Sequence, residues 1–390
     1  MRLSRLPALV FLLLSLCAGS ATAQDVYFTL HDYAPLWLNP AQTGAFSGSL
    51  RVGGIIRAQG AGLETYRSPT AFADAPVIKG LRKYDWIGVG ASLVSDRGFS
   101  DFSQGSDNNA KLTSTTFGFA ASYHLALDKK RRNVITLGAM YGSTNLGFEI
   151  QGVPVQELNI DSELGGQGMT GESEFEPTQE NPGGPGGNRN SNTSSSYTDI
   201  NAGLMLRSVL DPKKNNVLEV GFALAHLNRP EYQRLFRSET DGGPPTDTTV
   251  VNPPPVPGSL GTRERRRPRT LHFHGRLDLE LSDRYRIQPS AFVQTSAGNT
   301  AFSVQAWGAR RLRPQTDLRA GLGFRSTTGL ELMAGLDIKQ LRAAISYDLL
   351  RLSDSAVGGV TQPALELTAN YIFNFFKKPQ VVPTMLCPRI

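Results

Sequence analysis

The feature that most constrains the fold of this chain is an alternation of apolar and polar residues with a period of two. Across residues 271–281 the odd-numbered positions hold leucine, phenylalanine or glycine, and the even-numbered positions hold His, Arg, Asp or Glu. Segments 317–325 and 365–373 repeat the pattern. Successive side chains of a β-strand point to opposite faces, so such segments predict strands that separate two different environments. No segment shows sustained helical periodicity.

Fourteen segments fit this description, and most approach the roughly 9–11 residues that a tilted strand needs to cross a bilayer. Beyond the N-terminus, no apolar run reaches the about 18 residues of a membrane helix. The charged fraction of 19% is low for a soluble domain. A large soluble β-protein and a membrane β-barrel therefore remain. The predicted strands are 50–58, 70–77, 86–95, 113–125, 133–142, 197–207, 217–226, 270–281, 285–295, 301–310, 317–325, 329–337, 341–349 and 364–374.

The lengths of the connections favour the membrane barrel. Bacterial outer-membrane barrels have an even number of strands, short periplasmic turns and long outer loops. If the chain starts in the periplasm, the two longest connections, 143–196 and 227–269, both fall on the outer side. We therefore predict an all-β fold: a transmembrane antiparallel up-and-down β-barrel of about 14 strands, with polar residues lining a wet lumen. The predicted periplasmic turns include 127–132, 208–216, 282–284 and 338–340.

Aromatic residues near the predicted strand ends are expected to form the girdles that such barrels place at the membrane interfaces. They are Trp86, Tyr141, Trp307, Tyr347, Tyr371 and Phe373.

The N-terminus has the three parts of a secretory signal peptide. Arg2 and Arg5 supply positive charge, 6–18 is apolar, and Ala21-Thr22-Ala23 is a cleavage site of the A-x-A type. We expect an exported protein in the bacterial outer membrane, with both termini in the periplasm. The predicted divisions are a signal peptide at 1–23, a periplasmic or plug segment at 24–48, the barrel at 49–376 and a periplasmic tail at 377–390.

The two long connections carry opposite charge. The connection 143–196 holds eight acidic residues and one arginine, and 227–269 holds eight arginines and five acidic residues. They are expected to be long, charged, extracellular loops. One hypothesis places the acidic loop over the basic loop as a lid on the barrel, and another lets the basic run contact lipopolysaccharide phosphates. No nucleic-acid partner is expected for an exported chain whose basic groups are not interleaved with aromatic residues.

No arrangement of residues points to catalysis, a cofactor or a metal. His272 and His274 share one strand face, but no third ligand is identifiable, and a polar pair facing the lumen explains them equally well. The glycine-rich run 183–187 lacks the ending and context of a phosphate loop. Once Cys17 leaves with the signal peptide, Cys387 is the single cysteine and cannot form a disulfide within the chain. We expect no enzyme and no bound cofactor.

Several short motifs, taken in order, resemble the PorP/SprF family of outer-membrane proteins, which serve the type IX secretion and gliding-motility system of Bacteroidetes-type bacteria. The resemblance covers 24–376 apart from the two long connections. Among its motifs are Leu38-Asn39-Pro40-Ala41, Leu50-Arg51-Val52-Gly53, Tyr66-Arg67-Ser68-Pro69, His226-Leu227-Asn228-Arg229-Pro230, Gly321-Leu322-Gly323-Phe324-Arg325 and Ile345-Ser346-Tyr347-Asp348-Leu349.

The resemblance implies a barrel that works beside the type IX translocon. Such a protein would associate with the periplasmic ring of the machine, or help to export and retain cell-surface proteins that carry a C-terminal sorting domain. The size of the two charged connections and the tail ending near Cys387 depart from the family pattern, so a core or an accessory role stays open. The positions that match the family pattern are Asn39, Pro40, Arg51, Tyr347 and Asp348.

Charged residues on the polar strand faces are expected to pair in the lumen or to bind a plug, since an unpaired buried charge is costly. They include Arg57, Arg319, Arg325, Glu331 and Asp337. Two other functions remain open at this stage. One is an outer-membrane channel for small or hydrophobic solutes, and the other is a lipid-modifying enzyme.

Overall fold

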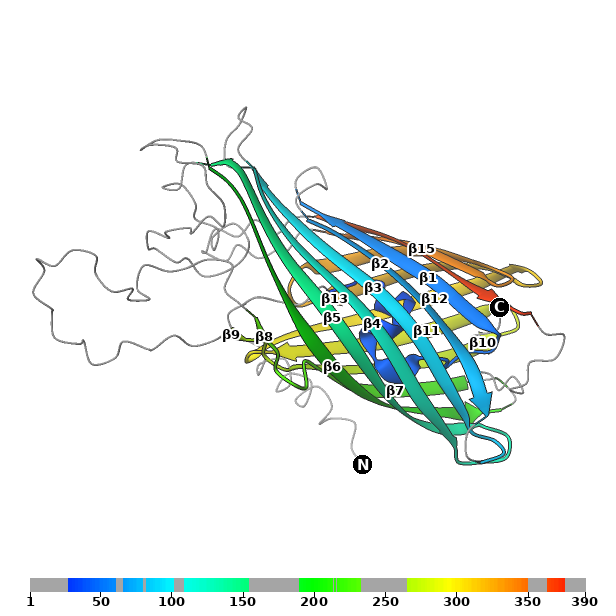
Figure 1. Cartoon of the computed structure of the whole chain (residues 1–390). Coiled ribbons are helices and arrows are strands. Elements are labelled where there is room, and N and C mark those ends of the chain that lie inside the picture. Colours follow the sequence, from blue (N-terminus) through cyan, green and yellow to red (C-terminus); the bar gives the residue numbers. More distant parts are fainter. Residues whose placement is uncertain are drawn as a thin grey trace, which may run out of the picture.

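A computed structural model shows fourteen strands that close into one antiparallel barrel (Figure 1). It describes residues 27–60, 66–79, 82–101, 109–153, 189–212, 214, 216–232, 265–349 and 363–375. The barrel strands are β1 (Leu50–Gln59), β2 (Tyr66–Lys79), β3 (Trp86–Asp101), β4 (Asn109–Ala126), β5 (Asn133–Val153), β6 (Arg189–Asp211), β7 (Asn216–Ala225), β10 (Thr270–Ser282), β11 (Tyr285–Ser296), β12 (Asn299–Arg313), β13 (Thr316–Arg325), β14 (Gly329–Ile338), β15 (Leu341–Asp348) and β16 (Ala364–Phe373).

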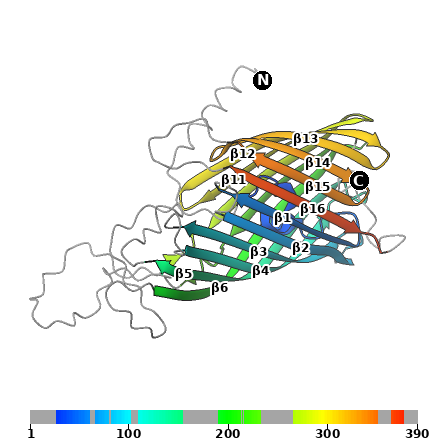
Figure 2. The same ribbon diagram turned by 90° about the horizontal axis from the view of Figure 1, so that it is seen from above.

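Each barrel strand pairs with its neighbours in sequence, and β16 closes the sheet by pairing with β1, where Leu50 lies opposite Phe373 (Figure 2). Strands β8 (Glu231–Tyr232) and β9 (Arg265–Arg266) form a separate two-stranded sheet outside the barrel sheet. In the barrel, β7 therefore pairs with β10. Closure leaves the barrel sheet without free edge strands. The predicted fold, up-and-down topology and fourteen strands are confirmed.

The two faces of the sheet have opposite chemistry. Leu322 is 64% exposed and Leu271 is 40% exposed, whereas Glu331 and Glu366 are completely buried in the lumen. Apolar side chains that point outward and polar side chains that point inward are typical of a barrel in lipid.

No helix in the described part of the chain is long and apolar enough to cross a membrane.

Five neighbouring strands, β2 to β6, are longer than the sequence pattern predicts. The longest, β5 and β6, contain 21 and 23 residues, and in Figure 1 this wall rises beyond the rest of the barrel. The prediction of one loop over 143–196 is therefore wrong at both ends, because 143–153 and 189–196 are paired as strand. Ser, Thr, Asn and Gly weaken the apolar alternation there, although the backbone pairing continues. The central part, 154–188, and the lid hypothesis that depends on it lie outside the described residues.

The second long connection, 227–269, contains the paired strands β8 and β9. Residues 233–264 and the tail 377–390 lie outside the description.

The predicted aromatic girdle is only partly correct. Trp86 and Trp307 are 0% and 2% exposed and point into the barrel, where Trp86 stacks on His124. Both residues lie on the strand face that points into the lumen. A position near the end of a strand does not show which face of the sheet a side chain is on. The other four aromatic residues are exposed on the outer face: Tyr141, Tyr347, Tyr371 and Phe373.

The lumen contains a segment of the chain itself. Residues 27–48, which we call the lumenal segment, form the short helical turns η2 (His31–Tyr33), α2 (Pro35–Leu38) and η3 (Pro40–Gln42), drawn in dark blue inside the barrel in Figure 1. Most of its residues are buried. Prolines at the first position favour α2 and η3, and Asn39 caps η3 by accepting a hydrogen bond from the Ala41 N–H over 2.9 Å. From the sequence, 24–48 is expected either in the periplasm or as a plug in the barrel. In the structure, residues 27–48 lie inside the barrel.

A row of small residues lets the lumenal segment lie flat on the barrel wall. Gly88, Ser122, Gly138 and Gly203 are directly opposite one another on β3, β4, β5 and β6. A Cβ on Gly138 would lie 2.4 Å from the Ala41 nitrogen. At Gly88 and Gly138 the backbone of the segment occupies the space of a side chain, and at Gly203 the Asn39 side chain does, so these positions require glycine.

We predict that Gly203→Ala destabilises the protein. The added Cβ would lie 1.9 Å from the Asn39 Oδ1 atom, and overpacking of this kind costs about 1–3 kcal/mol. Gly147→Ala on the same wall is the matched control, because a Cβ there meets nothing within 4 Å. Thermal unfolding in detergent should show a lower midpoint for Gly203→Ala alone. Equal midpoints for both variants would contradict the placement of Asn39.

Candidate functional site: the lumenal segment and its charge cluster

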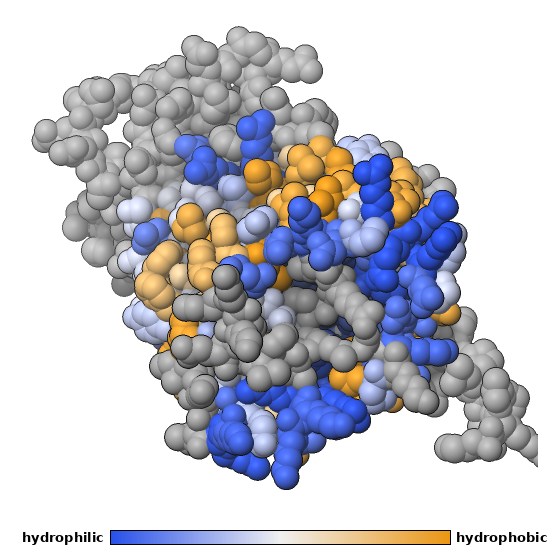
Figure 3. Space-filling model, turned by 90° about the vertical axis from the view of Figure 1, so that its right-hand side faces the viewer, coloured by the Kyte–Doolittle hydropathy of each residue, from blue (hydrophilic) through white to orange (hydrophobic). Residues whose placement is uncertain are grey.

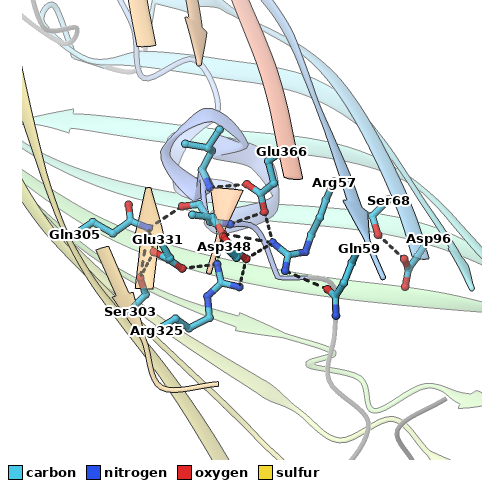
Figure 4. A network of polar contacts seen from close by, with 12 residues as sticks. Arg57, Gln59, Ser68, Asp96, Ser303, Gln305, Arg325, Glu331, Asp348 and Glu366 are labelled. Atoms are coloured by element: carbon cyan, nitrogen blue, oxygen red, sulfur yellow. Dashed lines mark hydrogen bonds and ion pairs between the residues drawn. The ribbon is translucent and has the colours of Figure 1, made fainter. Parts of the chain in front are cut away.

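A buried carboxylate holds the start of the lumenal segment. The two oxygens of Glu366 accept hydrogen bonds from the backbone N–H groups of Thr29 over 2.7 Å and Leu30 over 2.8 Å. Arg57, directly opposite on β1, donates to the same carboxylate over 2.5 Å (Figure 4). Bonds of this kind to an ionised group are roughly twice as strong as neutral ones.

Three further charged residues complete this site. The Thr29 hydroxyl donates to Asp348 over 2.8 Å and accepts from Arg325. The Arg325 guanidinium also lies 2.7 Å from a Glu331 oxygen. We call the five charged side chains around Thr29 the charge cluster: Arg57, Arg325, Glu331, Asp348 and Glu366.

The charge cluster depends on the lumenal segment for its hydrogen bonds. It contains three carboxylates and two guanidiniums, all buried, with Glu331 and Glu366 completely so. The excess negative charge is met by uncharged donors, which include the backbone N–H groups of the segment and the amide of Gln305. Gln305 also donates to the Thr29 carbonyl over 2.8 Å. Buried charges are tolerated only when they are paired and hydrogen-bonded, so the segment and the wall stabilise one another.

A second group of charges contacts the segment at Asp32. The Asp32 carboxylate lies 3.6 Å from Arg276, which in turn lies 3.1 Å from Glu219. Arg207 extends the chain of charges at 3.4 Å from Glu219. These residues come from β6, β7 and β10, a different part of the wall from the charge cluster.

Tyr33 connects the segment to a third region of the wall. Its hydroxyl accepts a hydrogen bond from Arg319 over 2.9 Å, and its carbonyl accepts one from Asn370 over 3.2 Å. Arg319 lies over the Trp307 ring, 4.6 Å from its centre, and donates to Gln288 over 2.6 Å. A cation held on an aromatic face in this way is stabilised by the ring quadrupole.

The middle of the segment is held through Asn39. Its side-chain nitrogen donates to the Leu204 carbonyl over 3.1 Å and lies 3.1 Å from the His274 Nε2 atom. His272 Nδ1 lies 3.2 Å from the Leu38 carbonyl. Both histidines therefore bind the lumenal segment. Among the described residues, no group of three or more His, Cys, Asp or Glu side chains is arranged to hold a metal ion.

The end of the segment is held where β1 begins. Asp74 accepts from the Gly44 N–H over 2.7 Å and from the guanidinium of Arg51 over 2.9 and 2.8 Å. The Thr43 carbonyl accepts from Ser122 over 2.5 Å. Gly44 has a φ of +66°, in the left-handed region that favours glycine. The segment is therefore fixed along its whole length.

The two ends of the segment lie toward opposite ends of the barrel. Thr29 contacts residues near the last positions of β1 and β13, whereas Gly44 lies near the first positions of β3 and β1. Phe373, near the end of the described chain, pairs with Leu50 at the start of β1. The described chain therefore begins and ends toward opposite ends of the barrel, and residues 24–26 lie outside the description.

The residues that the sequence predicts as site residues lie in three places. Seven charged residues are buried or nearly buried and face the lumen: Arg51, Arg57, Arg319, Arg325, Glu331, Asp337 and Asp348. Asn39 and Pro40 belong to the segment itself. Tyr347 is different, because it is 40% exposed on the outer face. The structure brings three of these charged residues into contact with Thr29: Arg57, Arg325 and Asp348.

Sequence reasoning missed the residues that receive the segment. Asp74, Gln305 and Glu366 are its polar partners on the barrel wall. Glu366 lies on the polar face of a recognised strand, which was the available signal. Nothing in the pattern connects it with Thr29, because 337 positions separate the two residues.

A small pocket lies next to Arg319, which donates to Tyr33 of the segment. Its lining includes Asp278, Arg286, Gln288, Trp307 and Arg319.

Comparison with known proteins gives one family. The model of the family described as type IX secretion system membrane protein PorP/SprF matches residues 20–371. No curated protein matches the sequence.

Solved structures that resemble this one include two toluene transporters and a FadL homologue. The toluene transporter TbuX of Ralstonia pickettii has 11% identity and a TM-score of 0.49, with 92% of this chain and 97% of that chain covered. The toluene transporter TodX of Pseudomonas putida has 14% identity and a TM-score of 0.47, with 93% and 98% covered. A FadL homologue of Pseudomonas aeruginosa has 12% identity and a TM-score of 0.45, with 92% and 97% covered.

We predict that Glu366→Ala releases the start of the lumenal segment. The change removes the acceptor of two backbone N–H groups and one of the two carboxylates that pair with Arg57. Breaking a buried ion pair costs about 3–5 kcal/mol. The readout is maleimide labelling of Leu30→Cys in a Cys387→Ser background, since Leu30 is 2% exposed. Labelling should be slow in the parent and fast with Glu366→Ala.

Glu280→Ala is the matched control, because this glutamate lies on a lumen-facing strand position and no hydrogen bond of its carboxylate holds the segment. It should leave Leu30→Cys unlabelled. Equally slow labelling in both variants would show that Glu366 does not hold the segment.

Proposed function

The chain belongs to the PorP/SprF family of type IX secretion system membrane proteins, and from this premise we propose that it helps to export or anchor surface proteins. The cargo would carry C-terminal sorting domains, and the barrel would dock on the periplasmic ring of the machine. The observation that carries this proposal is the family match over nearly the whole chain, from 20 to 371. The protein is a bacterial outer-membrane β-barrel. A role in gliding motility is a further part of the proposal, because the resemblance to the PorP/SprF family implies it.

The occupied lumen supports a docking function rather than transport through the barrel. The lumenal segment is fixed at Thr29, Asp32, Tyr33, Asn39 and Gly44 by side chains from many strands. A solute path would require these contacts to break, and several of them join buried charges. In the proposed function the barrel performs no chemical step. It holds partners at its two ends.

We propose that the end with the short turns faces the periplasm, as in other bacterial barrels. This end carries the turns 127–132, 283–284 and 339–340 together with Phe373, and we call it the short-turn end. The long wall of β3 to β6 then projects from the cell surface, where cargo is retained. In this orientation the C-terminus is periplasmic, and the lumenal segment runs from the outer half of the barrel towards the periplasm.

Deletion of the gene tests the secretion function. Comparison of the surface and secreted proteomes with and without the gene should show loss of proteins that carry C-terminal sorting domains. Loss of one or a few indicates a dedicated accessory, and broad loss indicates a core component. Complementation with the intact gene should restore them. Unchanged levels of all such proteins would overturn the proposed function.

The channel alternative has its own test. We expect the purified full-length barrel to show no steady conductance in planar bilayers, because the lumenal segment fills the lumen. Steady single-channel steps from the unaltered protein, or uptake of a hydrophobic solute that depends on it, would favour a channel for small or hydrophobic solutes instead.

A further inference from the structure

Positive charge gathers around the whole short-turn end of the barrel. Each of the six turns there, between β2 and β3, β4 and β5, β6 and β7, β10 and β11, β12 and β13, and β14 and β15, carries at least one exposed Lys or Arg in or beside it. Figure 3 faces this end and shows strongly hydrophilic residues gathered around its margin. We call this set the basic ring: Arg82, Lys83, Lys129, Lys130, Lys214, Arg284, Arg310, Arg313 and Lys339.

The acidic residues of this end do not neutralise the basic ring. Among the described residues of these turns, Asp283 is the one exposed acid. Asp85 is buried and accepts hydrogen bonds from the Ala126 N–H over 3.0 Å and from the Tyr123 hydroxyl over 2.8 Å. Asp317 is buried and lies 2.5 Å from Arg286. Asp128 and Asp211 are half-buried, and Asp128 accepts from the Arg132 N–H over 2.7 Å. The exposed charged residues described at these turns are therefore mainly basic.

The basic ring lies beside the lipid-facing band. Leu127, Leu281, Leu312 and Ile338 are 53%, 64%, 51% and 38% exposed, and each is within three positions of a member of the ring. Outward apolar side chains of a membrane barrel meet the acyl chains. Lys and Arg that flank such an apolar band reach the layer of lipid headgroups with their long side chains.

The opposite end of the barrel has a different arrangement. Its described hairpin turns, 297–298 and 326–328, contain only Ala, Gly, Ser and Thr. Among the residues that the structure describes, the exposed arginines of that end lie on β2, β3 and the connection after β7. Within the described ranges, positive charge follows all the turns of the short-turn end but not the turns of the opposite end.

We propose that the basic ring binds the phosphates of anionic glycerophospholipids in the inner leaflet of the outer membrane. The proposal rests on the orientation given above, with the short-turn end in the periplasm. Lys and Arg at a membrane surface attract anionic headgroups, and Arg donates to two phosphate oxygens at once. A single docked protein would cover one arc of the barrel, whereas a shell of lipid meets all six turns. Bound headgroups would set the depth of the barrel and the height of the turns above the membrane.

Native mass spectrometry of the full-length protein tests this proposal. The protein is exchanged into detergent with equal amounts of phosphatidylglycerol, phosphatidylethanolamine and lipid A. The test variant carries Gln at Lys129, Lys130, Arg284 and Arg313, and the control variant carries Gln at four exposed arginines of the opposite end: Arg67, Arg97, Arg229 and Arg269. Retained lipid is counted for each species, and the shift of the folded barrel on unheated gels confirms that both variants fold.

The unaltered protein and the control variant should retain phosphatidylglycerol in preference to phosphatidylethanolamine. In the test variant the ratio of retained phosphatidylglycerol to phosphatidylethanolamine should fall about tenfold. Equal retention of the two phospholipids, or equal preference in both variants, would overturn the proposal. Preference for lipid A that the test variant loses would assign the ring to the outer leaflet and overturn it as stated. An acidic protein that co-purifies through the ring, without lipid preference, would replace lipid with a protein partner. None of these results depends on loss of cargo, so the secretion function is tested separately.

Discussion

The hydrogen bonds between the Glu366 carboxylate and the backbone of Thr29 and Leu30 are the contacts on which the lumen depends. A barrel of fourteen strands is wider than one that its own side chains fill, so the charges on its inner wall need partners. Here the chain supplies them from its N-terminal part, while Arg57 and Arg325 offset most of the negative charge. The lumenal segment and the inward charges are therefore one structural unit, and neither is stable without the other.

The surfaces of the protein differ in chemistry according to what each one contacts. The outer face is apolar where it meets lipid, and the inner face is polar where it meets the segment. The basic ring is exposed at the short-turn end. The small-residue row on β3 to β6 lies on the longest wall of the barrel. The wall that projects furthest is thus also the wall on which the segment rests. This leaves the two ends of the barrel, rather than its interior, as the places for partners.

The sequence predicts the barrel well because strand alternation is local. The period of two identifies the fourteen strands, which the structure confirms. It also assigns Arg319, Arg325 and Glu331 to the polar strand faces, and these side chains are buried. The strand pattern fails to predict features that depend on residues far away in the sequence, and it fails where a strand has a polar composition. The extensions of β5 and β6 have a polar composition, and Trp86 faces inward because His124 and the Gly44 carbonyl receive it there. The contact of Thr29 with Glu366 spans 337 positions, and no periodicity encodes it.

Hydrogen–deuterium exchange of the intact protein in lipid tests the lumenal segment most directly. The N–H groups of Thr29, Leu30, Ala41 and Gly44 all donate to buried carboxylate or amide oxygens. The account predicts that a peptide covering 27–48 exchanges as slowly as the barrel strands β13 and β14. Exchange of this peptide within seconds, at the rate of an unstructured chain, would show that the lumen is not occupied by the segment and would contradict the account.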